Sequence, residues 1–125
     1  MTVYVDDAEI AATVGKHTSK WSHLTADTST ELDRFAASIG LNPSWIQYAG
    51  TPLEHYDITL SKRTAALRNG AIPITSRESG YQVMSKSKGI PFGLEEVREF
   101  RDSLSATTHL STKNYDRKQE HDLGE

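Results

Sequence analysis

The chain has 125 residues, about the length of one domain, which excludes a large two-domain enzyme with separate cofactor and substrate halves. Its 36% hydrophobic and 25% charged residues indicate a small core, and the absence of cysteine excludes a disulfide scaffold and thiolate chemistry. The net charge of −3 is unevenly spread, with −5 over residues 1–59, +5 over residues 60–88 and −3 over residues 89–125.

The first predicted element is a short strand. Thr2–Val5 alternates β-branched and aromatic residues and stops at Asp6 and Asp7, which strands avoid. Residues 8–20 have small and polar side chains without a sustained period. They predict either a mobile loop that acts as a lid or a weak second strand leading to residues 21–24.

The next predicted element is a helix. Thr28 and Glu31 have the spacing of a capping box, in which each side chain bonds the other residue's main-chain N–H. Apolar residues from Leu32 to Ile39 follow the helical period, and Gly40 is placed to end the helix.

The second half of the chain predicts a helix over residues 60–70, an edge strand over residues 71–75 and a weaker helix over residues 76–89. An amphipathic helix follows over residues 94–104. We therefore expect an α/β or α+β fold: one small domain over residues 1–105, with helices packed on a short sheet. Residues 106–125 are expected to form a polar tail or an oligomerisation arm. Because the core is small, we expect a homo-oligomer that buries Phe92, Leu94, Val97 and Phe100.

The predicted helix that begins near residue 60 carries the first candidate site. A helix start favours acidic side chains, but this one offers Ser61, Lys62 and Arg63. Free main-chain N–H groups, a hydroxyl and two cations are suited to bind a phosphate or carboxylate. The alternative is a structural role, in which Glu54 or Asp57 pairs with these cations.

Three further groups of residues are candidates. In an extended segment His55 and Asp57 point to one face, as an acid/base pair, as metal ligands or as hydrogen-bond partners, while Tyr56 turns the other way. Asp6 and Asp7 are adjacent carboxylates at the end of a strand. Such a pair can bind a hard cation or ribose hydroxyls, or it can simply shape a turn. Strand alternation also places Trp21 and His23 on one face, with an aromatic plane beside an imidazole. This arrangement suits stacking on a base, or the tryptophan simply fills a small core.

Four short blocks in this order resemble the domain of unknown function 4031, a family found in bacteria and their phages. The blocks are Val3–Asp7, Trp21–Asp27, His55–Arg63 and Asn69–Ile74. The resemblance covers about residues 1–76 and implies no established chemistry, so it assigns no role to any residue. It does fall on the same blocks that the physical arguments select.

These residues predict binding of a phosphorylated small molecule, most simply a nucleotide-like anion. Ser61, Lys62 and Arg63 would bind phosphate, Trp21 or Tyr56 would stack on a ring, and Asp6, Asp7 or Asp57 would bind sugar hydroxyls. A phage-encoded protein of this kind would sequester a host nucleotide immune signal.

The alternative is a metal-dependent phosphodiesterase or pyrophosphohydrolase acting on a nucleotide. A divalent cation would be the cofactor, with Asp6, Asp7 and Asp57 as candidate ligands and His23, His55 and Asp57 as candidate catalytic residues. A third hypothesis is an interaction module that works through the C-terminal helix and tail. The acidic total disfavours duplex nucleic acid. No apolar run approaches the roughly 18 residues that span a bilayer, and no signal peptide is evident, so we expect a cytoplasmic protein without a membrane partner.

Overall fold

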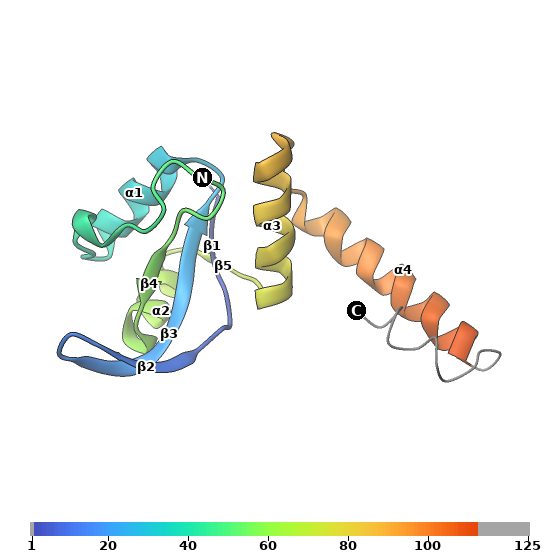
Figure 1. Cartoon of the computed structure of the whole chain (residues 1–125), viewed down its shortest axis with the longest axis horizontal. Helices are drawn as coiled ribbons and strands as arrows, with labels where there is room; N and C mark the ends of the chain where they lie inside the picture. The colour runs from blue at the N-terminus through green and yellow to red at the C-terminus, as the bar shows by residue number, and fades with distance from the viewer. Residues whose placement is uncertain (1, 113–125) are drawn as a thin grey trace. The chain divides into compact units, whose positions relative to one another are not determined.

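The fold is built around one long strand, β3 (His17–Ala26), in the computed structural model (Figure 1). β1 (Val3–Val5), β2 (Ile10–Val14) and β4 (Tyr56–Ile58) each pair antiparallel with β3. β5 (Ile72–Pro73) pairs parallel with β1 at the edge of the sheet, where its proline costs no ladder hydrogen bond.

The structure describes the backbone of residues 2–112 and the side chains of residues 2–104. The chain divides into two compact units, residues 1–92 and residues 93–125. Within the described residues, the first unit holds all five strands together with α1 (Ser29–Ser38), α2 (Leu60–Arg68) and α3 (Ser76–Lys88), and the second holds α4 (Leu94–Thr112). The predicted α+β class with a C-terminal helix is confirmed.

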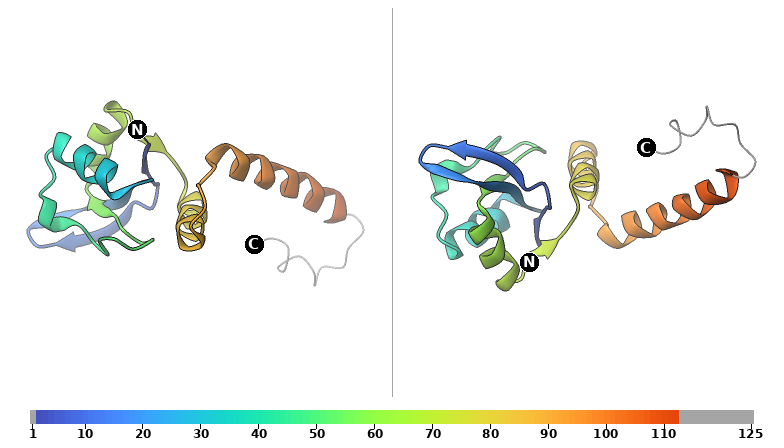
Figure 2. Two further views of the ribbon diagram at one scale, coloured as in Figure 1. Left: turned by 90° about the horizontal axis from the view of Figure 1, so that it is seen from above. Right: turned by 90° about the horizontal axis from the view of Figure 1, so that it is seen from below.

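Side-chain alternation gives the sheet one apolar face. Leu24 and Ala26 of β3 point to the same side as Val3 and Val5 of β1, and all four are at most 2% exposed. Helices α1 (Ser29–Ser38) and α2 (Leu60–Arg68) cover this face, and Figure 2 shows both on the same side of the β2–β3 hairpin. Their apolar residues complete the core: Leu32, Phe35, Ala36, Ile39 and Ala66. We call this side of the sheet the core face and the other side the polar face.

The segment predicted as a lid or a weak second strand is a strand. β2 and β3 form a hairpin through Gly15 and Lys16, and Gly15 has the positive φ of 60° that a two-residue hairpin turn requires. The lid expectation is therefore wrong. The small, unpatterned side chains of β2 reflect its full exposure, because an unburied strand has no apolar face to select.

A bulge separates β1 from β2. Val5 pairs with Leu24 and Ile10 pairs with Trp21, so the six residues from Val5 to Ile10 lie opposite only four residues of β3. Glu9 has a positive φ of 46° within this bulge. The bulge starts at Asp6, whose main chain leaves the ladder there.

The predicted cap of α1 forms only in part. Thr28 Oγ1 accepts the Glu31 N–H, as expected, but Glu31 Oε2 accepts the N–H of Thr2 instead of reciprocating. The complete capping box lies on α3 (Ser76–Lys88), between Thr75 and Glu78.

Helix α4 runs from Leu94 to Thr112 and is longer than the predicted 94–104 segment. The first residues assigned to a polar tail thus continue the helix, whereas residues 113–125 lie outside the described part of the chain. Across the residues that are described, no helix combines the length and apolar character needed to span a membrane.

Candidate functional site

A row of ionisable side chains crosses the polar face of the sheet. His23 of β3 and Asp57 of β4 are direct cross-strand partners. Asp6 lies on the other side of His23, because its main-chain N–H donates to His23 O at 3.1 Å. His55 precedes Asp57 by two residues and therefore projects from the same face. Strand pairing thus brings together four residues from three distant parts of the sequence.

Asp6 holds both the main chain and the ring of His23. Its Oδ1 accepts the His23 N–H at 2.8 Å and the Ala8 N–H at 3.2 Å, and its Oδ2 bonds His23 Nδ1 at 2.7 Å. In a regular ladder the His23 N–H would donate to the main-chain carbonyl of Asp6. The bulge turns that carbonyl away, and the side-chain carboxylate of Asp6 accepts the N–H instead. Since an ionised carboxylate only accepts hydrogen bonds, His23 Nδ1 must carry a proton.

The orientation of His55 is fixed in the same way. Its Nδ1 lies 2.7 Å from the carbonyl oxygen of Leu53, which also only accepts, so Nδ1 of His55 carries a proton as well. The neutral form of each histidine consequently has its lone pair on Nε2. A carboxylate or carbonyl behind the distal nitrogen is the usual arrangement for metal-binding histidines.

Three acceptor atoms then converge. His55 Nε2 lies 3.3 Å and His23 Nε2 lies 3.7 Å from Asp57 Oδ1, and one ligand atom from each of the three residues lies within 4.8 Å of the others. Tetrahedral ligands of a zinc ion are about 3.3 Å apart, given bonds of about 2.0–2.1 Å. When both rings are neutral, the three atoms repel one another unless a cation lies between them. Either a metal ion between the three atoms or a proton on one of the two rings would remove this repulsion.

The protonation equilibria of the cluster reflect these contacts. The hydrogen bond to Asp6 raises the pKa of His23; partial burial opposes this, and the charges of Asp6 and Asp57 add to it. Burial alone would raise the pKa of Asp6, but the hydrogen bonds from His23 outweigh it and hold that pKa below its usual range. The hydrogen bond with His55 lowers the pKa of Asp57 against the effect of burial. The cluster is therefore most stable with Asp6 ionised.

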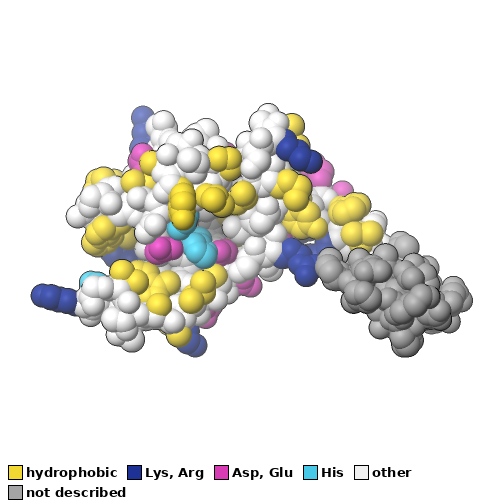
Figure 3. Space-filling model, viewed as in Figure 1, with side chains coloured by type: hydrophobic (Ala, Val, Ile, Leu, Met, Phe, Trp, Pro, Cys, Tyr) yellow, Lys and Arg dark blue, Asp and Glu magenta, His cyan; other side chains and the backbone are white. Residues whose placement is uncertain are grey.

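The cluster is open to solvent. The side chains of His23 and Asp57 are 33% and 37% exposed, whereas Asp6 is buried behind them at 3%. Figure 3 shows the imidazoles in a hollow with carboxylates beside them and groups of apolar side chains above and below. One ring near the hollow is Tyr48, whose centroid lies 6.1 Å from that of His55. A small molecule can thus reach the histidines and also contact apolar surface.

Sequence reasoning missed Tyr48 and the carbonyl of Leu53. Tyr48 is 60% exposed and has a positive φ of 53°, a backbone conformation that side chains other than glycine rarely adopt. Neither the φ angle nor a carbonyl acceptor leaves a sequence signal. The nearby Gly50 indicated only a turn.

The three residues predicted to bind phosphate have main-chain and local partners. Lys62 Nζ donates to Ile39 O at 2.6 Å, at the end of α1, and Arg63 Nε donates to Asp6 O at 3.0 Å. Ser61 Oγ lies 3.3 Å from the hydroxyl of Thr59, which caps α2. The two cations at this helix start therefore each donate to a main-chain carbonyl of another part of the fold.

Three other predicted residues have contacts of their own. Tyr56 is 1% exposed on the core face, and its hydroxyl donates to Asp33 Oδ1, so its ring is not available to stack on a ligand. Asp7 accepts the N–H and the hydroxyl of Ser76 and thereby caps the start of α3. Trp21 lies on the polar face, and its indole N–H donates to Ala12 O at 2.9 Å across the hairpin.

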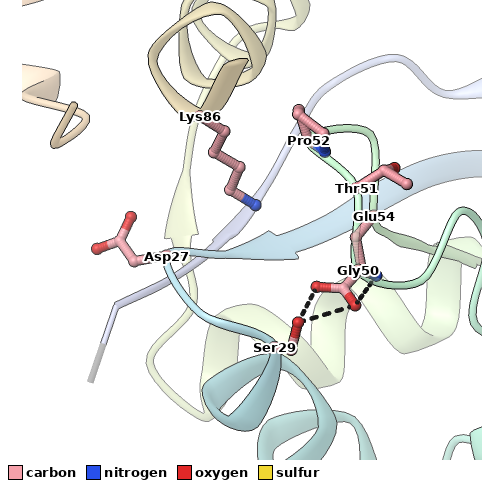
Figure 4. A pocket seen from close by; sticks show the side chains of 7 residues that line it. All are labelled: Asp27, Ser29, Gly50, Thr51, Pro52, Glu54 and Lys86. Atoms are coloured by element: carbon pink, nitrogen blue, oxygen red, sulfur yellow. Dashed lines mark hydrogen bonds between the residues drawn. The ribbon is translucent and has the colours of Figure 1, made fainter. Parts of the chain in front are cut away.

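A separate cleft of about 230 Å³ is lined in part by the segment that precedes His55, and Figure 4 shows its lining residues. The buried Glu54 carboxylate accepts from Ser29 Oγ at 2.7 Å and from the Gly50 N–H at 3.0 Å, which ties the segment before His55 to the start of α1. Lys86 extends from α3 toward this cleft, and partial burial lowers the pKa of its ammonium group. The lining residues are Asp27, Ser29, Gly50, Thr51, Pro52, Glu54 and Lys86.

Comparison with known proteins gives one result. No curated protein and no solved structure matched the chain. A family model described as a protein of unknown function (DUF4031) matches residues 3–86, which extends ten residues past the limit of 76 expected from the sequence blocks and takes in most of α3. The match includes all four residues of the histidine and aspartate row. The chain therefore belongs to the DUF4031 family of proteins of unknown function.

Proposed function

We propose that His23, His55 and Asp57 bind one divalent metal ion and that the protein hydrolyses a phosphodiester or pyrophosphate bond in a nucleotide-like molecule. The observation that carries the proposal is the convergence of two Nε2 lone pairs and one carboxylate oxygen, each imidazole being oriented from behind by Asp6 or Leu53 O. Two histidines and a carboxylate leave coordination positions open, as catalytic metal sites do.

The chemistry of the ligands indicates which metals to test. Imidazole nitrogens suit zinc and other late first-row ions better than magnesium or calcium, which prefer oxygen. Such an ion would supply Lewis acidity, which activates water and polarises a phosphoryl oxygen. In the hydrolysis, the water oxygen would form a bond to phosphorus, the bond to the leaving oxygen would break, and the leaving oxygen would take up the proton that the water gives up.

Arg63 is our candidate for stabilising a phosphate group. Its Nε holds Asp6 O, next to the residue that orients His23, and no hydrogen bond to its two terminal nitrogens is found within residues 2–104. A guanidinium group with two uncommitted nitrogens suits bidentate binding of a phosphate. Tyr48 offers an exposed ring for a nucleobase beside His55.

Binding of a nucleotide-like anion without cleavage is the second candidate, and it would include sequestration of an immune signal if the chain is phage-encoded. The same uncommitted guanidinium of Arg63 supports it. We also propose that the protein is cytoplasmic, that it forms a homo-oligomer and that it has no duplex nucleic acid partner.

The two candidates differ in whether the ligand is returned intact. The purified protein should be incubated with a panel of nucleotides and with bis-p-nitrophenyl phosphate, with and without zinc, manganese or cobalt. We expect hydrolysis that requires metal and that is lost in His55→Gln but retained in His17→Gln, a matched change at an exposed histidine of the same sheet. A thermal shift with a nucleotide that is recovered unchanged would support the binding function instead.

A further inference from the structure

The outer edge of β2 has no partner strand among the residues that the structure describes. β2 lies at the end of the strand order, and all five of its residues are exposed. Exposed edges in natural proteins are normally protected by charge, proline or a covering element. The sequence of β2, Ile-Ala-Ala-Thr-Val, has neither charge nor proline. Ile10 and Val14 are each 55% exposed at its two ends.

The hairpin geometry tells which main-chain groups face outward. Val14 and His17 flank the two-residue turn and therefore form a hydrogen-bonded pair. Alternation along the strand then directs the main-chain groups of Ala12 toward β3 and those of Ala11 and Thr13 to the free edge.

We propose that β2 pairs antiparallel with β2 of a second copy of this chain, on a two-fold axis that passes through Ala12. In this register Ala11 of each copy faces Thr13 of the other, and each of these pairs exchanges two main-chain hydrogen bonds. The two sheets then become one continuous sheet whose polar faces lie on the same side. The proposal is independent of the metal chemistry proposed above.

The side chains of β2 fit this register. Ile10 of one copy lies opposite Val14 of the other, so the two exposed apolar ends cover each other. Ala12 of one copy lies opposite Ala12 of the other, and these small uncharged side chains do not clash. The residues that flank the strand, Glu9 and Lys16, have opposite signs, and the two-fold axis brings Glu9 of one copy next to Lys16 of the other. Self-complementarity of shape and charge favours a second copy over a foreign strand.

A single cysteine tests the register directly, because the chain contains no other cysteine. Ala12 residues across a non-hydrogen-bonded pair are about 4.5 Å apart between Cα atoms, within the range of a disulfide. We expect Ala12→Cys to form a covalent dimer under mild oxidation and to do so far more slowly in urea. Lys16→Cys is the matched control, because its two copies would be roughly 27 Å apart at about 3.4 Å per residue.

Charge reversal provides an independent test by sedimentation of the full chain. We expect wild type to be a dimer, Ala12→Lys and Ala12→Glu each to be monomers because like charges meet on the axis, and an equimolar mixture of the two to recover the dimer. Ala11→Pro should also be monomeric, since its lost N–H faces the free edge and the hairpin itself keeps its ladder. Circular dichroism checks that each variant folds.

A wild-type chain that sediments as a monomer even at hundreds of micromolar overturns the proposal. A dimer that survives both Ala12→Lys and Ala11→Pro also overturns it, because its interface would then lie elsewhere. Unchanged metal binding per chain in folded monomeric variants would separate this result from any failure of the proposed catalytic site.

Discussion

The two faces of the sheet use the same strands for different purposes. On β3, Leu24 and Ala26 point into the core and are at most 1% exposed, whereas His23 lies between the polar partners Asp6 and Asp57 on the other face. Successive residues thus alternate between stability and the candidate site. A change on the core face should therefore act on unfolding, whereas a change to the cluster on the polar face should act on ligand and proton binding.

The core face should give the largest effect. We expect Leu24→Ala to lower the free energy of unfolding by about 2–5 kcal/mol, because it removes buried methyl groups and leaves a cavity beside α1 and α2. Urea unfolding monitored by tryptophan fluorescence measures it. The folded variant should still bind metal, and loss of binding in the folded state would contradict the separation of the two faces.

The ion pair of Asp6 and His23 should make stability depend on pH in the absence of metal. The lowered pKa of Asp6 contributes stability above about pH 4, which is lost as pH falls through its folded value. The raised pKa of His23 contributes stability below about pH 6.5, which is lost as pH rises through its folded value. The stabilisation is therefore complete between about pH 4 and pH 6.5.

The predicted deficit of His23→Gln is greatest in this pH window, about 1.5–3 kcal/mol for a charge-assisted hydrogen bond. It should shrink above neutral pH. Unfolding free energies of wild type and variant, measured with a chelator from pH 4 to pH 9, check the profile. A deficit that is constant over this range would show that the pair does not titrate as described.

Asp6→Asn should weaken metal binding without removing any ligand. An amide in place of the carboxylate cannot accept from both the main chain and the ring of His23, so its NH₂ group would favour the tautomer that carries the proton on Nε2. We expect a loss of about 10–100-fold in metal affinity. Calorimetric titration measures it, with Asp33→Asn as a control on α1. Unchanged affinity would mean that Asp6 has no positioning role.

The smallest effect should come from a polar group on the core face. Tyr56→Phe removes the hydroxyl that donates to Asp33 at 3.0 Å and should cost about 0.5–1.5 kcal/mol of stability. Burial and that carboxylate raise the pKa of Tyr56 to about 12. A pH titration of tyrosine absorbance should therefore lose one late-titrating group in this variant, while Tyr4, whose pKa is raised by burial and by Asp27, still titrates late. Metal affinity should not change.

Part of this account was accessible from the sequence because it depends on local periodicity. Alternation alone placed His55 and Asp57 on one face and Tyr56 on the other, and apolar spacing located α1. The assembly of the cluster was not accessible. Asp6 meets His23 only through antiparallel pairing across a bulge, and residues 8–20 gave no clear signal of that hairpin.

The partners of the residues predicted to bind phosphate also depend on contacts that are distant in sequence. Lys62 and Arg63 suggested an anion site because a helix start favours acidic side chains, and Glu54 or Asp57 offered the alternative of a structural pair. Their acceptors are the main-chain carbonyls of Ile39 and Asp6, which lie far away in sequence and come close only after folding.

The most direct test of the central claim is a titration of the metal-free protein with cobalt(II), followed by absorbance and calorimetry at pH 7.5. We predict one ion per chain, with the visible bands of a low-coordinate nitrogen and oxygen site, and competition by zinc. Binding should weaken as pH falls and protons occupy the imidazoles, should be lost in His55→Gln and Asp57→Asn, and should persist in His17→Gln. Absence of binding, or binding that His55→Gln leaves unchanged, would contradict the account.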